Sequence, residues 1–391
     1  MKSDFISKRL PLTVINQPPF IPLTEEISRL EKKLSMFNPN LEREDATAIP
    51  LFWYYDPDIY NAEQAVLRQN WVGVGRTGEA AAHRSYFTLK VAEEPIAVWR
   101  DQDTIRAFLN SCRHRATQLL PNGKMLPDDT VKCPYHGWTY DLKGQLRRAP
   151  ELGKVNGFSR DGYSLIPFEV DTWGPIVFVR MEPGKEVLSN VLAPMMQQTV
   201  DKELSSLKWA ERREYEIACN WKVYVDNFLD GGYHIPQIHP ELAKALNYPQ
   251  YRTEVFEYCS LQHSPVKNAE DPIASVRQGS DAMYWCVFPN VMANIYHGAM
   301  DTNIVIPTAI DRCKVIFDFY FSDKRDKSFI QTYIDGSHKV QLQDMSVCED
   351  VQQGLKSRFG KPGPYAKREE GVLHFHRLLA LQMKEFCENL K

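Results

Sequence analysis

The sequence predicts an α+β protein in which a small domain of short strands precedes a larger domain of antiparallel strands and long helices. Between about residues 70 and 180, alternating apolar and polar runs are separated by glycine, proline and asparagine, as in hairpin strands. From about residue 185 onward, strand-like runs are mixed with long segments of helical periodicity. The expected domains are a helical segment that packs on the larger domain (1–50), the small β domain (51–180) and the larger domain (181–391).

The individual elements follow from apolar periodicity. Residues 24–36 are expected to form a capped amphipathic helix, because Ile27, Leu30 and Leu34 share one face. Other segments with helical periodicity are 62–71, 326–355 and 371–390. Segments with strand-like alternation are 86–101, 168–181, 283–298, 301–310 and 313–322. Residues 214–228 begin as a strand and pass into a helix.

Composition excludes several classes of protein. The 391 residues are 43% hydrophobic and 25% charged with a net charge of -3, which gives no indication of a nucleic-acid surface. No apolar run approaches the roughly 20 residues of a membrane span. The N-terminus lacks the apolar core of a secretory signal and carries acidic residues early, so a cytoplasmic protein is expected. The eight scattered cysteines indicate reduced thiols, a subset of them with a metal role.

Two short motifs in the predicted β domain each combine one cysteine with one histidine. Cys112 and His114 form a Cys-x-His pair, and Cys133 and His136 form a Cys-x2-His pair. Two such loops can clamp a two-iron, two-sulfur cluster, with the cysteines on one iron and the histidines on the other. Zinc is the alternative, although zinc fingers place their two cysteines together and their two histidines together.

Two further histidines, His234 and His239, lie five residues apart in a stretch crowded with aromatic and acidic residues. Pro236 lies between them and breaks regular helix geometry, which lets the two imidazoles converge. Two histidines with one carboxylate leave open positions on Fe(II) for oxygen. The alternative is that these histidines only decorate a helix. The upstream cysteine–histidine pairs favour the metal, because a cluster that transfers single electrons needs an acceptor.

Three stretches carry a family resemblance. CRHRATQL (112–119) and CPYHGWTYDLKGQL (133–146) resemble the two signature loops of Rieske proteins. NWKVYVDNFLDGGYHIPQIH (220–239) resembles the iron-binding segment of Rieske non-haem iron oxygenase α-subunits. The resemblance is nearest to the choline monooxygenase branch and its quaternary-ammonium-oxidising relatives, and it departs at Ala116, where the family often has glycine. It implies a Rieske [2Fe-2S] β domain followed by a catalytic domain of the helix-grip type.

The resemblance also implies the third iron ligand. In that family it is an aspartate on a later helix, and the matching position is Asp344, with Glu349 and Asp350 as competitors. Asp344 and Cys348 are one helical turn apart, so Asp344 can face the site while Glu349 points elsewhere.

A carboxylate three residues before the first iron histidine usually links the cluster of one subunit to the iron of its neighbour. Gly231 occupies that position here. Asp230 is the first candidate for the linking role, because the Gly231–Gly232 pair can re-aim it. Asp226, about one turn earlier, is the second candidate. A plain capping or surface role is the alternative for Asp230.

The resemblance implies an oxygenase that uses O2, mononuclear Fe(II) and the cluster on a small quaternary ammonium substrate. The reaction is either oxidation of choline to betaine aldehyde or N-demethylation of a betaine or carnitine-like compound. Such a cation binds against aromatic faces, and the candidate residues are Tyr284, Trp285, Phe288 and Tyr296. Strand alternation places Trp285 opposite Tyr284 and Phe288, so the four cannot all line one pocket. A core role is the alternative for each.

Electrons are expected from a separate ferredoxin or flavin reductase, with NAD(P)H acting only through it. No G-x-G-x-x-G fingerprint is recognised after a predicted strand, so no nicotinamide or flavin domain is expected in the chain. The family implies a homotrimer. One alternative is an aromatic-ring hydroxylase or O-demethylase of the same architecture. A non-catalytic Rieske electron carrier is another, but His234, His239 and Asp344 argue against it.

Overall fold

The computed structural model describes residues 24–267 and 271–391. Within these residues the chain divides into two compact units, one formed by 67–185 and the other by 24–66 together with 186–391. Residues 51–66 therefore group with the larger unit and not with the β domain. The reason is packing, since Trp53 and Ile59 are fully buried in the same core as Trp221. The N-terminal residues behind the cytoplasmic prediction lie outside the described part of the chain.

The unit at 67–185 contains an antiparallel sheet with the strand order β1-β9-β8-β4-β3-β2. Its strands are β1 (Val72–Arg76), β2 (Tyr86–Val91), β3 (Glu94–Asp101), β4 (Thr104–Leu109), β8 (Pro167–Trp173) and β9 (Ile176–Arg180). A small sheet contains β5 (Thr130–Lys132), β6 (Thr139–Asp141) and β7 (Leu146–Arg148), and the short 3-10 helices are η2 (Thr77–Ala80) and η3 (Asp161–Tyr163). The predicted strand pairs at 86–101 and 168–181 are confirmed as β2–β3 and β8–β9.

The first strand of this unit corrects one reading of the sequence. Gly73, Gly75 and Gly78 do have the spacing G-x-G-x-x-G. Gly73 and Gly75, however, lie inside β1, where they pair with β9, and only the four-residue η2 follows. A dinucleotide fingerprint needs a loop that opens a longer helix and presents its N–H groups to phosphate. The first two glycines of this string therefore belong to a strand and the third to η2, which is not the arrangement of a dinucleotide-binding loop.

The larger unit is built on an antiparallel sheet with the order β10-β16-β15-β14-β13-β12-β11. Its strands are β10 (Lys208–Ile217), β11 (Arg252–Val255), β12 (Cys259–Pro265), β13 (Asp281–Val287), β14 (Val291–Tyr296), β15 (Ala299–Ala309) and β16 (Arg312–Phe321). The consecutive strands predicted between 283 and 322 are confirmed as β13 to β16, each antiparallel to the next.

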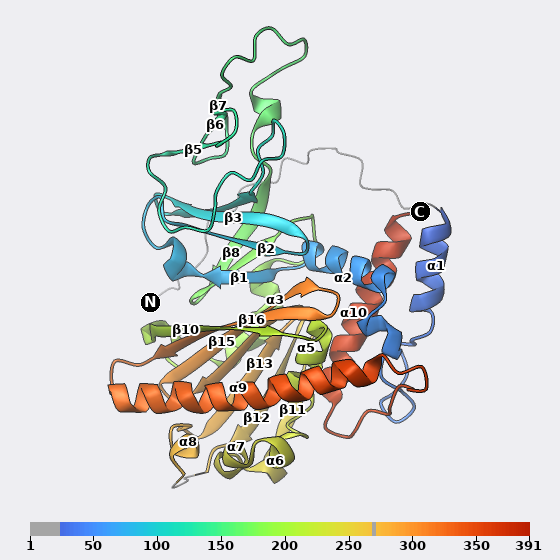
Figure 1. The fold of residues 1–391 in the computed structure, drawn as a ribbon. Coiled ribbons are helices and arrows are strands. Elements are labelled where there is room, and N and C mark those ends of the chain that lie inside the picture. The colour runs from blue at the N-terminus through green and yellow to red at the C-terminus, as the bar shows by residue number, and fades with distance from the viewer. Residues whose placement is uncertain (1–23, 268–270) are drawn as a thin grey trace. The chain divides into compact units, whose positions relative to one another are not determined.

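Helices cover this sheet, and α9 runs across one of its faces (Figure 1). The helices are α1 (Thr24–Leu34), α2 (Pro57–Gln69), α3 (Leu188–Val191), α4 (Ala193–Gln198), α5 (Trp221–Leu229), α6 (Ile235–Ile238), α7 (Pro240–Ala245), α8 (Pro272–Ser275), α9 (Lys327–Leu355) and α10 (Glu370–Asn389). The 3-10 helices are η1 (Leu51–Tyr54), η4 (Leu204–Ser206) and η5 (Tyr248–Gln250). Among the described helices, none is long and apolar enough to cross a membrane.

The N-terminal helix behaves as its sequence predicts. Ile27, Leu30 and Leu34 of α1 are buried, and α1 lies beside α10 (Figure 1). Hydrophobic side chains at this spacing form one apolar stripe that the neighbouring helix covers. The helical segment thus packs on the larger unit.

Helix α5 is fixed in the core at its N-terminal end. Asn220 caps the helix by accepting a hydrogen bond from the backbone N–H of Lys222. Lys222 is fully buried, and its Nζ lies 2.6 Å from Oε1 of Glu63 on α2. A second oxygen of Glu63 accepts a hydrogen bond from the Trp221 indole at 2.8 Å. A buried ion pair tolerates little movement, because separating its charges leaves one unpaired in the core. Helix α5, which also carries Asp226 and Asn227, is therefore held rigidly at this end.

Candidate metal centres and substrate cavity

The two cysteine–histidine motifs lie on two tight loops of the β unit. Cys112 begins a turn in which its carbonyl accepts a hydrogen bond from the N–H of Ala116 at 2.9 Å. Cys133 begins the matching turn, closed by the N–H of Gly137 at 3.1 Å. Ala116 and Gly137 both have positive φ, at 56° and 68°. This conformation favours glycine, so Ala116 occupies a backbone position that suits glycine better than alanine.

The four side chains of these loops converge. Nδ1 of His114 lies 3.1 Å from Nδ1 of His136, so the two ring nitrogens face each other. Cys112 and Cys133 are both buried, and burial raises the pKa of the Cys112 thiol. Each cysteine therefore lies inside the unit while the histidines lie toward its surface. Two buried thiols behind two imidazoles fit a cluster with cysteines on its inner iron and histidines on its outer iron.

Aromatic residues hold this arrangement in place. The Trp138 ring stacks on the His114 ring with centroids 4.9 Å apart and an interplanar angle of 5°. The Tyr140 hydroxyl lies 3.4 Å from Sγ of Cys112 and accepts a hydrogen bond from the N–H of Arg113. Hydrogen bonds to ligand sulfur are one of the means by which a protein tunes the potential of an iron–sulfur cluster.

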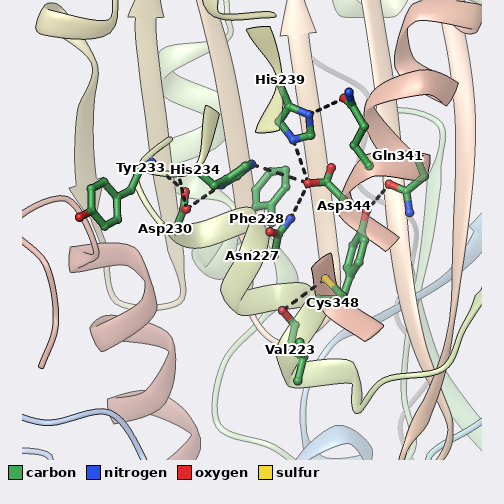
Figure 2. A network of polar contacts seen from close by, with 12 residues as sticks. Val223, Asn227, Phe228, Asp230, Tyr233, His234, His239, Gln341, Asp344 and Cys348 are labelled. Carbon is green, nitrogen blue, oxygen red and sulfur yellow. Dashed lines mark hydrogen bonds and ion pairs between the residues drawn. The ribbon is translucent and has the colours of Figure 1, made fainter. Parts of the chain in front are cut away.

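In the larger unit, His234, His239 and Asp344 come together from segments about 100 residues apart (Figure 2). One ligand atom from each lies within 4.8 Å of the other two. Nε2 of His239 is 2.9 Å from Oδ1 of Asp344, and Nε2 of His234 is 3.7 Å from the same oxygen. Two imidazoles and one carboxylate on one side of an ion are the donor set of non-haem Fe(II) oxygenases. The side chains therefore fit that metal.

The local chain geometry explains how histidines five residues apart converge. His234 immediately precedes α6, and His239 lies between α6 and α7. Pro236 and Pro240 both lie in the first turn of these helices, where a missing N–H costs least. His239 has φ -124° and ψ 66°, outside helical values, so the chain bends at the ligand itself. The rings of His234 and His239 consequently lie 5.0 Å apart at 83° to each other.

Amide side chains orient two of these ligands. Nδ1 of His239 donates to Oε1 of Gln343 at 2.8 Å, which leaves Nε2 free to face the site. Asn227 on α5 donates from Nδ2 to Oδ1 of Asp344 at 2.8 Å. The sequence reasoning missed both amides. The sequence gives a weak indication of a site role for Asn227, because this residue lies about one turn before the Gly231–Gly232 pair. For Gln343 the sequence gives no indication except its position next to Asp344.

The competing carboxylates on α9 lie elsewhere. Oε1 of Glu349 accepts a hydrogen bond from the backbone N–H of Ala218 at 3.1 Å, and Asp350 is exposed. Cys348, one turn after Asp344, faces the Val223 carbonyl of α5 (Figure 2). Only Asp344 of these three carboxylates lies with the two histidines.

The structure separates the two candidates for the linking carboxylate. Oδ2 of Asp230 lies 2.6 Å from Nδ1 of His234 and accepts a hydrogen bond from the backbone N–H of the same residue at 3.0 Å. Burial lowers the pKa of His234, the hydrogen bond and charge of Asp230 raise it, and the net pKa lies above the usual value. Asp226 instead contacts Tyr54 at 2.6 Å and His376 at 3.0 Å, and neither is a candidate ligand.

The glycine in place of the usual carboxylate has a steric cause. Gly231 has a φ of 70°, and a Cβ added there would lie 2.1 Å from the backbone oxygen of Arg368. No side chain fits at that distance without moving backbone. In this chain the carboxylate that contacts the first histidine is therefore the preceding residue, Asp230.

A cavity with an empty volume of about 760 Å³, including the space at its mouth, has His234, His239 and Asp344 in its wall. Its aromatic lining includes Phe228, Tyr251, Tyr284, Tyr296, Phe317 and Tyr333. Polar lining residues that the sequence did not indicate include Arg277 and Asp301, because both depend on how distant strands come together.

The four aromatic candidates for substrate contact do not share one place. Tyr284 and Tyr296 line the cavity, and their hydroxyls lie 2.6 Å apart. Trp285 belongs to the opposite face of β13, where its ring stacks near Phe256 at 5.9 Å. Phe288 follows β13 and packs in the core against Phe375. The prediction that Trp285 and Phe288 line the pocket is therefore corrected, because both pack in the protein interior instead. Strand alternation turns Trp285 away from the cavity, and Phe288 lies beyond the end of β13.

Comparison with known proteins identifies the family of this chain. Residues 70–159 match the model of the Rieske [2Fe-2S] domain, and residues 204–385 match that of the ring hydroxylating alpha subunit (catalytic domain). A chloroplastic choline monooxygenase of Arabidopsis thaliana is 36% identical over 377 residues, covering 92% of this chain and 88% of that protein. The carnitine monooxygenase oxygenase subunit of Escherichia coli K12 is 28% identical, covering 88% and 95%.

A crystal structure of the quaternary ammonium Rieske monooxygenase CntA superposes with a TM-score of 0.78 at 25% identity, covering 90% of this chain and 98% of that one. The chain belongs to the Rieske non-haem iron oxygenases, in the family of ring-hydroxylating alpha subunits. Its enzyme class is a Rieske-type non-haem iron monooxygenase. Its cofactors are a Rieske [2Fe-2S] cluster and a mononuclear iron that works with O2.

Proposed function

We propose that this chain is the oxygenase component of an enzyme that hydroxylates a small quaternary ammonium compound. The observation that carries the proposal is the position of His234, His239 and Asp344 in the wall of an aromatic-lined cavity. A quaternary ammonium group cannot donate hydrogen bonds, so its recognition depends on aromatic faces and on charge. The aromatic side chains that line the cavity supply such faces.

We assign His234, His239 and Asp344 as ligands of the iron, and Cys112, His114, Cys133 and His136 as ligands of the cluster. The bound iron and cluster would supply the redox chemistry. In that reaction O2 takes up two electrons and two protons, one oxygen atom enters a substrate C–H bond and the other leaves as water. The protein supplies orientation. Gln343 and Asn227 hold two of the iron ligands, and the cavity wall decides which C–H bond lies nearest.

The names of the relatives support the substrate class. One relative is a choline monooxygenase and another a carnitine monooxygenase subunit, and CntA structures are described with the substrates L-carnitine and gamma-butyrobetaine. Two reactions are compatible with this class. Hydroxylation at the alcohol carbon of choline gives a geminal diol, which loses water to form betaine aldehyde. Hydroxylation of an N-methyl group gives an unstable N-hydroxymethyl compound, which releases formaldehyde and leaves the demethylated amine.

Electron supply is part of the same proposal. A separate ferredoxin or flavin reductase passes electrons from NAD(P)H to the cluster. The protein works as a homotrimer in which the cluster of one subunit serves the iron of the next, in line with the inter-subunit electron transfer described for CntA. Asp230 is the linking carboxylate, because it contacts His234 directly. A cytoplasmic location stays a prediction, and the named plant relatives are chloroplastic.

The experiment is a substrate panel with the purified protein, a reductase, NADH and O2. Choline, glycine betaine, L-carnitine and gamma-butyrobetaine are compared with benzoate and a methoxybenzoate. The expected result is product from at least one methylammonium compound, measured as betaine aldehyde or formaldehyde, with NADH consumed in equal amount. Turnover confined to the aromatic compounds would establish the alternative, a ring hydroxylase or O-demethylase.

An iron determination separates the oxygenase from an electron carrier. An oxygenase holds about three irons per chain, two in the cluster and one in the mononuclear site, whereas a Rieske carrier holds about two. A value near two, with the cluster spectrum intact and no turnover of any compound, would contradict the proposal.

A further inference from the structure

The substrate cavity contains a fixed positive charge that the proposed function does not use. Arg277 lines the cavity and is only 5% exposed. Its guanidinium lies 6.0 Å from the ring centre of Tyr296 and 5.8 Å from that of Tyr333. Arginine stays charged in proteins and offers five donors in a planar fork that matches a carboxylate. A wall built only to attract a quaternary ammonium cation would not place this cation in it.

The position of Arg277 along the cavity follows from α9. Tyr333, beside Arg277, and Asp344 lie on the same helix, eleven residues apart. At 1.5 Å per residue the two positions are about 16 Å apart along the helix axis. Arg277 therefore lies at the end of the cavity remote from the iron ligands. A substrate with a methyl group beside His234 and Asp344 needs several carbons to bring a second group to this end.

The facing sheet places Asp301 and Tyr296 in neighbouring rows of the cavity wall. Met292 pairs with Asn303, Asn294 with Asp301, and Tyr296 with Ala299, in successive rows of β14 and β15. Asn303, Asp301 and Tyr296 all line the cavity. Rows two residues apart are separated by about 6.8 Å along the strand. Asp301 and Tyr296 thus lie about one such step apart, and Arg277 lies over Tyr296.

Asp301 is suited to a cation that forms no hydrogen bonds. Its carboxylate is buried and accepts hydrogen bonds from Asn294 at 2.7 Å, Asn303 at 3.1 Å and Tyr333 at 2.9 Å. Burial is the largest influence and raises the pKa of Asp301 above its usual value, and these donors, which lower it, offset burial only in part. An ionised carboxylate held in this way offers negative charge without needing a donor from the ligand. The cavity wall thus contains a negative group, Asp301, and a positive group, Arg277, which both lie beside Tyr333.

We propose that Arg277 binds the carboxylate of a zwitterionic substrate, a trimethylammonium carboxylate with several carbons between its two charges. The inference rests on the proposed function and narrows its substrate class. The ammonium group lies toward Asp301 and the iron ligands, and the carboxylate lies between the guanidinium of Arg277 and the tyrosines around it. Choline has no anionic group and is too short to reach this end, so it gains nothing from Arg277.

The competing explanation is structural. Arg277 would then only balance the charge of Asp301 and stiffen Tyr296 and Tyr333. In that case removal of its charge would weaken the fold and affect every substrate equally, whereas a carboxylate site affects only substrates that carry a carboxylate. The two explanations therefore differ in substrate selectivity and not merely in total activity.

The test compares two ligands that differ in the carboxylate alone, gamma-butyrobetaine and n-butyltrimethylammonium. Binding is measured by calorimetry and kcat/KM by formaldehyde release, for the full protein and the variants Arg277→Met and Arg277→Lys. Arg312→Met, at an exposed arginine at the start of β16, is the matched control. We expect the full protein to prefer gamma-butyrobetaine, and Arg277→Met to bind it about 10- to 100-fold more weakly, the usual loss for a charge-assisted pair. Binding of n-butyltrimethylammonium should change less than about threefold in either Arg277 variant, and Arg277→Lys should retain part of the preference.

Equal loss of both ligands in Arg277→Met would overturn the inference, and so would a full protein that binds n-butyltrimethylammonium as tightly as gamma-butyrobetaine. Efficient turnover of choline with no turnover of any carboxylated compound would overturn it while leaving the proposed function standing. If no methylammonium compound turned over, the proposed function would fail, and the calorimetric comparison would still decide whether Arg277 recognises a carboxylate.

Discussion

The two sites that we propose as metal centres are built in opposite ways. The four side chains of the cluster site come from two loops within 25 residues of chain, and its histidines lie toward the surface of their unit. The iron site joins a segment at 234–239 to a helix position about 100 residues later, and its His239 is only 1% exposed. One site thus presents its outer ligands to solvent, as a centre that exchanges electrons requires, while the other encloses its ligands beside a substrate cavity.

This difference predicts different responses to damage. Loops closed by their own hydrogen bonds hold a cluster that contributes to their order, so loss of one cysteine affects the centre as a whole. The iron ligands are held by α5, α9 and the amides between them, which exist without the metal. Substitutions in the first site should therefore remove a cofactor and local order together, and substitutions in the second should remove only the metal.

The largest effect is expected from Cys112→Ser. A thiolate that holds the inner iron is replaced by a much weaker ligand, so the visible absorbance of the cluster should disappear and turnover should fall below detection. Iron should drop from about three to about one per chain. Cys259→Ser, at a buried cysteine of β12, is the control and should keep the spectrum. A normal cluster spectrum in Cys112→Ser would refute the ligand assignment.

His239→Ala should also abolish turnover, but through the other centre. The visible spectrum should remain unchanged, and iron should fall by about one per chain, because only the mononuclear site loses a ligand. Thermal unfolding should shift little, since the amides and helices still hold the site. His263→Ala, at a partly exposed histidine of β12, serves as the control. Loss of the cluster spectrum in His239→Ala would break the contrast between the two centres.

Asp230→Asn should have an intermediate effect. The amide keeps one acceptor oxygen, which can serve the backbone N–H of Tyr233 or of His234 but not both, and it removes the charge that faces the His234 ring. Turnover should fall about 10- to 100-fold, as for other partners of metal-bound histidines, while both centres remain loaded. Asp226→Asn is the matched comparison, because its contacts are Tyr54 and His376. If Asp226→Asn slowed the reoxidation of the reduced cluster more than Asp230→Asn did, the roles of the two would be reversed.

The smallest effect concerns a position outside both centres. Asp58 on α2 pairs with Arg29 and Lys33 of α1, and the hydrogen bond from Arg29 is the main cause that lowers its pKa from 3.8 to about 2. A lowered folded-state pKa means that the pair stabilises the protein above pH 4 and that this stabilisation is lost as pH falls toward 2. Asp58→Asn should cost about 1 kcal/mol of unfolding free energy at pH 7 and only a fraction of that at pH 2, where the folded-state carboxyl is about half protonated. Denaturant unfolding checks this, with the exposed Asp323→Asn as control, and metal content should not change.

The contrast between the centres also explains what the sequence could predict. Cys112, His114, Cys133 and His136 are recognisable because their ligand chemistry and spacing lie within one short stretch. His234 and His239 needed the additional argument from the upstream cluster, and Asp344 needed the family resemblance, since spacing alone leaves Glu349 and Asp350 as equals. The strands and long helices followed from periodicity with small changes at their ends, such as β15 beginning at Ala299 and not at residue 301.

The residues that escaped prediction share a physical cause. Gln343, Arg277 and Asp301 acquire their roles from partners on other elements, so no local pattern marks them. Trp285 was proposed for the pocket as one of a run of aromatic residues, but the pleat of β13 turns it to the other face. The grouping of residues 51–66 with the larger unit also depends on tertiary packing, which a change of sequence texture near residue 70 does not reveal.

The amides around the iron ligands have a consequence for metal selectivity. Gln343 fixes which nitrogen of His239 faces the site, and Asn227 fixes an oxygen of Asp344, so the donor set is ready before any ion arrives. A preformed set of two imidazoles and a carboxylate follows the general affinity order of divalent ions, in which Zn²⁺ and Cu²⁺ exceed Fe²⁺. Occupancy by iron is then decided by which ion the cell makes available. Protein produced with zinc in excess should fold normally, show an intact cluster spectrum and remain inactive until the zinc is exchanged.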